Sequence, residues 1–118
     1  MSYLAYKTVH LVGVFMVLLS IGALILLYAV KEERPALRKL AFATNGIGLL
    51  LALVAGFGLI AKLGLGFPIW VLIKILIWVA FLGLASMIKR QPGSAAAFWW
   101  TTLALASAAA YLALFKPF

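Results

Sequence analysis

The sequence predicts an all-α protein that crosses a lipid bilayer four times as an up-and-down, antiparallel four-helix transmembrane bundle. Hydrophobic residues make up 68% of the 118 residues and charged residues only 10%, whereas soluble domains are about half apolar and a quarter charged. The apolar residues also gather into four stretches, each near the roughly 20 residues that a helix needs to cross the hydrocarbon core. We therefore expect one integral membrane domain over residues 1–118, with spans at about 4–30, 40–61, 69–88 and 95–115.

The first span carries its polar and small residues on one side. Tyr6, His10, Gly13, Val17 and Ser20 recur at the i+3 and i+4 spacing of a single helical face. A polar side chain that faces lipid finds no hydrogen-bond partner. This face is therefore predicted to point into the bundle.

The first connection, residues 31–39, concentrates charge and contains the only two acids of the chain, Glu32 and Glu33. Pro35 is expected to block helix continuation within it. We interpret the two acids as partners of neighbouring basic side chains rather than as catalytic carboxylates. No aspartate and no cysteine is present, which excludes a hydrolytic triad, a disulfide framework and a thiol nucleophile.

The second span contains a ridge of small residues, Gly48, Ala52 and Gly56, at intervals of four. Such a ridge lets a neighbouring helix approach closely, so that dispersion contacts hold the pair where lipid provides no hydrophobic effect. We predict that these three residues serve helix packing. Asn45, about one turn into the same span, is interpreted as the partner in a hydrogen bond between helices.

The third span holds a lysine between two indoles, since Trp70, Lys74 and Trp78 follow one another at intervals of four. A lysine in a membrane span costs about 2.5–3.5 kcal/mol at the helix centre, which makes it a candidate functional residue. It can instead extend its long side chain to the headgroups, or stack on an indole. The fourth span is rich in alanine and suits close packing.

Charge in the connections predicts the orientation. The first and third connections carry Lys31, Arg34, Arg38, Lys39, Lys89 and Arg90. Because basic loops stay in the cytoplasm, both termini are expected on the opposite side of the membrane, which is the periplasmic side of a bacterial inner membrane if the protein resides there. The net charge of +8 thus suits lipid headgroups, and we expect no nucleic-acid partner.

This orientation puts His10 and Lys74 at similar depths, roughly 8–9 Å below the outer boundary at 1.5 Å per residue. His10 is interpreted either as a bundle histidine with a hydrogen bond or as an axial ligand to a haem-like cofactor, with Lys74 beside the propionates. The chain has one histidine, so it cannot form a bis-histidine site by itself.

Short motifs resemble the small bacterial inner-membrane families around HemJ-type protoporphyrinogen oxidase, the CopD-like domain and SirB-type proteins. Lys7, His10 and Gly13 match in the first span, Trp70, Val71 and Lys74 in the third, and the chain closes on KPF at residues 116–118. The stretch after His10 and the one before the last span differ from those of the oxidase family. The resemblance implies an association of His10 and Lys74 with haem b or porphyrin.

Two functions follow as hypotheses. The first is a non-catalytic accessory or structural subunit of a membrane complex, with the lipid bilayer, other membrane subunits or a second copy as partners. The alternative is a membrane protein that binds haem or porphyrin through His10 and Lys74. No set of catalytic residues is predicted, and the first hypothesis accounts for most of the chain.

Overall fold

The structure, a computed structural model, describes residues 2–31, 34–64, 66 and 68–115, without the side chain of Leu63. Its elements are α1 (Tyr3–Ala29), α2 (Pro35–Leu63), α3 (Ile69–Arg90), a short 3-10 helix η1 (Pro92–Ser94) and α4 (Ala95–Phe115). All four α-helices are long and apolar enough to cross a membrane. The predicted class, an all-α protein with four candidate membrane spans, is confirmed. Glu32 and Glu33, with their predicted ion pairs, and the KPF end at 116–118 lie outside the described residues.

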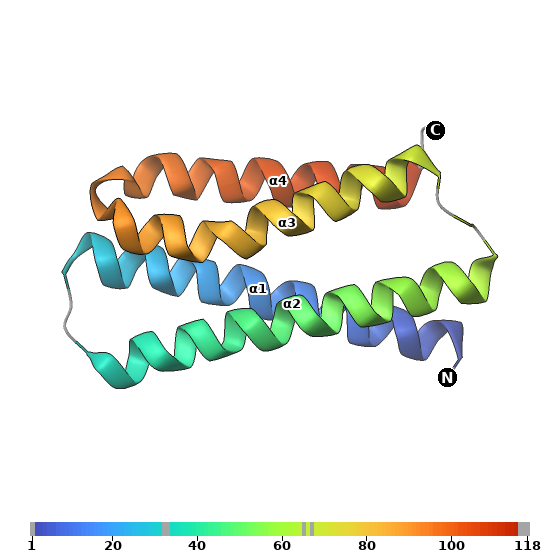
Figure 1. The fold of residues 1–118 in the computed structure, drawn as a ribbon, viewed down its shortest axis with the longest axis horizontal. Helices are drawn as coiled ribbons and strands as arrows, with labels where there is room; N and C mark the ends of the chain where they lie inside the picture. The colour runs from blue at the N-terminus through green and yellow to red at the C-terminus, as the bar shows by residue number, and fades with distance from the viewer. Residues whose placement is uncertain (1, 32–33, 65, 67, 116–118) are drawn as a thin grey trace.

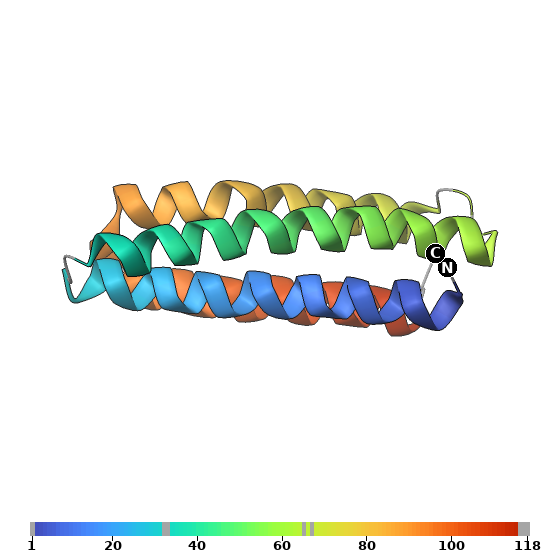
Figure 2. The same cartoon turned by 90° about the horizontal axis from the view of Figure 1, so that it is seen from below.

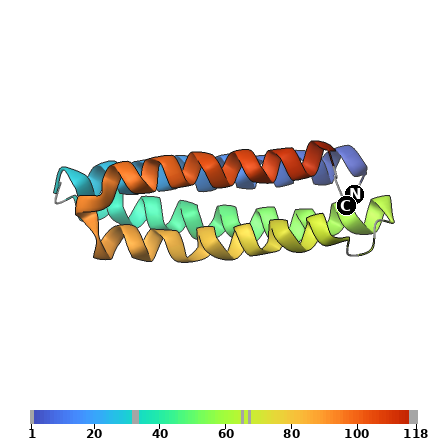
Figure 3. The same cartoon turned by 90° about the horizontal axis from the view of Figure 1, so that it is seen from above.

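Consecutive helices run in opposite directions, so the start of α1 and the end of α4 lie at the same end of the molecule (Figure 1). We call this the terminal end, and the opposite one, with the connections after α1 and α3, the loop end. The helices form two pairs, α1 with α2 and α3 with α4, and α1 makes contact with all three others. In the views turned by 90°, α1 lies beside α4 and α2 lies beside α3 (Figures 2 and 3).

Local sequence sets the helix ends. The Ser2 hydroxyl accepts a hydrogen bond from the amide of Ala5 at 3.2 Å, which caps α1. Gly64 ends α2 with a φ of +64°, a left-handed conformation that glycine adopts without steric cost. No helix continues through Pro35, because α1 ends at Ala29 and α2 begins at Pro35, ahead of Leu40, where the second span was expected to start. Proline suits the first helical position because the amide it lacks would have no helical partner there.

The α1–α2 pair is the tightest contact in the bundle. A Cβ atom built on Gly13 would lie 2.6 Å from the amide nitrogen of Ala52 and 2.7 Å from the carbonyl oxygen of Gly48. A Cβ on Gly48 would lie 2.8 Å from the carbonyl oxygen of Gly13. The two backbones therefore touch, and only residues without a side chain fit at Gly13 and Gly48.

The well-packed core occupies the loop-end half of the bundle. It contains buried side chains from all four helices, and Ile21, Leu24 and Ile88 among them are at most 1% exposed. Beside it the Ser20 hydroxyl bonds to the carbonyl of Val17 at 2.8 Å and lies 3.3 Å from the side-chain oxygen of Asn45. This contact confirms the predicted role of Asn45 in bridging helices.

Candidate functional site

The terminal-end half of the bundle is hollow. A cavity of about 480 Å³ lies between the two helix pairs and is lined by residues of all four helices. The buried hydrophobic cluster of this half is small and consists of Trp70, Val71 and Leu112. The cavity has the size of pockets that hold small molecules and cofactors, which usually measure about 300–1,000 Å³.

His10 lines this cavity and is fixed by a hydrogen bond to α2. Its Nδ1 atom lies 2.7 Å from the carbonyl oxygen of Ala52. A carbonyl only accepts, so Nδ1 is the nitrogen that carries the proton and donates it. The lone pair of the neutral ring is then on Nε2. A histidine whose other nitrogen donates to a backbone carbonyl is the usual arrangement of a metal ligand.

The small residues of α2 create the space for this ring. A Cβ atom on Gly56 would lie 3.4 Å from both Cε1 and Nδ1 of His10, so the imidazole rests directly against the helix backbone. Ala52 supplies the accepting carbonyl. The predicted packing residues Gly48, Ala52 and Gly56 thus all face α1, and two of them also position the histidine.

Lys74 lines the same cavity from α3. It is half-buried. His10 and Lys74 thus line one cavity from α1 and α3, and their equal depth in the bundle stays a prediction. The two indoles are placed differently. The Trp70 side chain is buried, with 8% of its surface exposed. The Trp78 side chain donates its Nε1 hydrogen to the carbonyl of Leu49 at 2.9 Å. That bond ties α3 to α2 one turn below the His10 bond.

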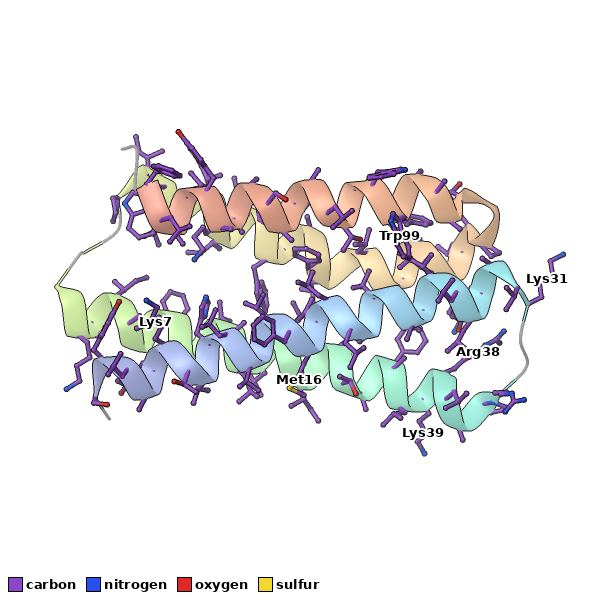
Figure 4. The ribbon with its side chains drawn as sticks, turned by 180° about the vertical axis from the view of Figure 1, so that it is seen from behind. Lys7, Met16, Lys31, Arg38, Lys39 and Trp99 are labelled. Atoms are coloured by element: carbon purple, nitrogen blue, oxygen red, sulfur yellow. The ribbon has the colours of Figure 1, made fainter. Side chains whose placement is uncertain are left out.

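Lys7 is a third basic residue of the cavity, a role that was not predicted from the sequence. It lines the cavity with Tyr3, and its ammonium lies 5.7 Å from the centre of the Tyr3 ring. Figure 4 shows Lys7 at the terminal end, in the space between the two helix pairs. Lys7 lies three residues before His10 on the same helical face, and this spacing could have predicted that the two residues line the same cavity.

The remaining wall is apolar and, on α4, thin. That helix contributes mainly alanines, namely Ala106, Ala109, Ala110 and Ala113. None of the described residues that line the cavity is acidic. The cavity is therefore apolar below His10 and Lys74 and positively charged around them, which suits an amphipathic molecule with an anionic group.

A metal ion held only by protein ligands does not fit the site. The described residues contain no group of three or more His, Cys, Asp or Glu side chains, and the whole sequence has one histidine and no cysteine. His10 could hold the iron of a tetrapyrrole, because the macrocycle would itself supply the other nitrogen ligands that the protein lacks.

Comparison with known protein families, with curated proteins and with solved structures found no match to this chain.

Proposed function

We propose that this four-span membrane protein binds haem b or a porphyrin in the terminal-end cavity. The observation that carries the proposal is the hydrogen bond from His10 Nδ1 to Ala52, which leaves Nε2 as the ring's lone-pair donor inside the cavity. The resemblance of the spans to HemJ-type, CopD-like and SirB-type proteins favours the same ligand class. The bound group would supply redox or light-absorbing chemistry, while the protein supplies the axial ligand, the charges and an apolar enclosure.

Each cavity residue has a distinct part in the proposed binding. His10 would ligate the iron, and the carbonyl of Ala52 holds its ring in one orientation and one tautomer. Lys74, with Lys7 nearer the terminal end, would pair with the propionates. An ion pair of this kind is stronger in an apolar surrounding than in water. The apolar side chains and the α4 alanines contact the macrocycle.

An absorption spectrum of the purified protein tests this proposal. Protein from haem-replete cells is expected to show a Soret band, which His10→Ala abolishes and added imidazole restores. Lys74→Gln is expected to weaken haem retention, whereas the matched change Lys31→Gln, at the loop end, leaves it unchanged. A colourless wild-type protein, or an unchanged band in a folded His10→Ala variant, contradicts the proposal.

A role as an accessory or structural subunit is a second candidate, and the exposure of α4 favours it. Only Phe98, Thr102 and Leu112 of this helix are buried, while large side chains such as Trp100 and Leu114 are 66% and 78% exposed. A partner subunit or a second copy would cover them. The size of the complex in a mild detergent tests this role, and a lone monomer without a co-purifying protein contradicts it.

The membrane that we propose is the bacterial inner membrane, with the loop end in the cytoplasm. The basis is the six cations of the first and third connections and the tendency of such loops to remain cytoplasmic. Figure 4 shows three of them, Lys31, Arg38 and Lys39, at one end of the molecule.

A further inference from the structure

A second hollow lies on the α3–α4 pair, at the loop end and apart from the terminal-end cavity. It measures about 400 Å³, and its lining residues lie between Ala80 and Leu105, in α3, α4 and the turn between them. Apolar side chains, including Leu84 and Phe98, line most of it, and Gln91 and Ser94 lie where the chain turns from α3 to α4. The hollow is thus an apolar groove with a polar rim at the loop end, and we call it the α3–α4 groove.

The length of this groove matches the depth of one lipid leaflet. Its first wall extends from Ala80 in α3 to Gln91, just past the helix end, and its second from Ser94 in η1 to Leu105 in α4. At 1.5 Å per residue, each wall is roughly 16 Å long. Half of the hydrocarbon core of a bilayer is about 15 Å. A groove that begins at the membrane surface and ends near the midplane has the reach of one acyl chain.

Positive charge flanks the rim. Arg90 is exposed and follows the groove residue Met87 by three positions, so the two lie on neighbouring parts of the helix surface. Lys89 is also exposed, but it follows Met87 by two positions and points to another side of α3. The other loop-end cations belong to residues 31–39, which also contain the only two acids of the chain. Charge at this end therefore favours an anionic headgroup.

We propose that the α3–α4 groove binds an anionic phospholipid from the leaflet at the loop end. One acyl chain lies in the groove against Leu84 and Phe98. The headgroup lies at the rim, where Gln91 and Ser94 can donate hydrogen bonds to phosphate oxygens and the Arg90 guanidinium pairs with the negative charge. This site is independent of the terminal-end cavity and of any cofactor there.

Native mass spectrometry tests this site. The full chain is reconstituted in vesicles with equal amounts of phosphatidylglycerol and phosphatidylcholine with identical acyl chains, and the lipids it retains are counted. The wild type is expected to retain phosphatidylglycerol preferentially. Arg90→Gln is expected to lower that preference about fivefold, because it removes the cation that pairs with the headgroup at the groove, an attraction of about 1 kcal/mol. The matched change Lys89→Gln is expected to leave it within twofold of the wild type.

A second pair of variants tests the groove itself. Ala97 lines the groove and is exposed, so Ala97→Phe fills it without disturbing the core and is expected to abolish the retained lipid. Ala96 is exposed outside the groove, so Ala96→Phe is the control and is expected to retain it. Equal retention of the two lipids by the wild type overturns the proposal, as does a preference that Ala97→Phe leaves unchanged.

Discussion

Replacement of Gly13 by alanine is expected to destabilise the bundle, although alanine is the better helix former. The added Cβ atom would lie 2.6 Å from the amide nitrogen of Ala52 and 2.7 Å from the carbonyl oxygen of Gly48. Both atoms belong to the α2 backbone, so no side-chain rotation relieves the clash. To reach ordinary contact, which begins near 3.4 Å, α1 and α2 must separate by about 0.8 Å, a gap that weakens dispersion contacts along the pair.

The expected magnitude is the balance of two effects. A gap of 0.5–1 Å removes roughly a quarter to a half of each dispersion contact, and overpacking of this kind costs about 1–3 kcal/mol. Alanine recovers about 1 kcal/mol through its helix propensity. We therefore expect Gly13→Ala to lower the free energy of unfolding by up to roughly 2 kcal/mol.

Unfolding of the purified protein in mixed micelles, with increasing sodium dodecyl sulfate and circular dichroism as the signal, measures this loss. The matched control is Gly46→Ala, because a Cβ atom on Gly46 meets no heavy atom within 4 Å. The control is expected to be neutral or to stabilise by up to about 1 kcal/mol. Equal transitions for the two variants would refute the argument that backbone contact holds α1 against α2.

Two further predictions concern helix attachment and topology. Trp78→Phe removes the hydrogen bond to Leu49 and is expected to lower the free energy of unfolding by about 1 kcal/mol in the same titration. The control is Trp99→Phe, which changes an exposed side chain and is expected to stay within about 0.5 kcal/mol of the wild type. The chain has no cysteine, so single cysteines can report which end of the bundle faces outward. In intact cells, an impermeant maleimide is expected to label Ser2→Cys, at the terminal end, but not Gly93→Cys, at the loop end. Labelling of both would contradict the antiparallel arrangement.

The sequence by itself determined the class of the protein and the faces of its helices. A chain that is 68% hydrophobic with four long apolar stretches has to satisfy its backbone within helices, because lipid offers no hydrogen-bond partners. The same reasoning correctly placed Gly13, Val17 and Ser20 inside the bundle, where all three are buried. Residue count along antiparallel helices also predicted similar depths for His10 and Lys74, and the structure shows that both line one cavity.

Other features depended on contacts between residues far apart in the chain. Apolar periodicity does not say which carbonyl a buried ring nitrogen meets, so the bond from His10 to Ala52 and that from Trp78 to Leu49 could not be predicted. The cavity could not be predicted either, because it lies beyond the large side chains of the loop-end core, where α4 presents alanines. Composition and spacing determine which side chains lie on each face of a helix. The distance and rotation between helices determine which atoms come into contact.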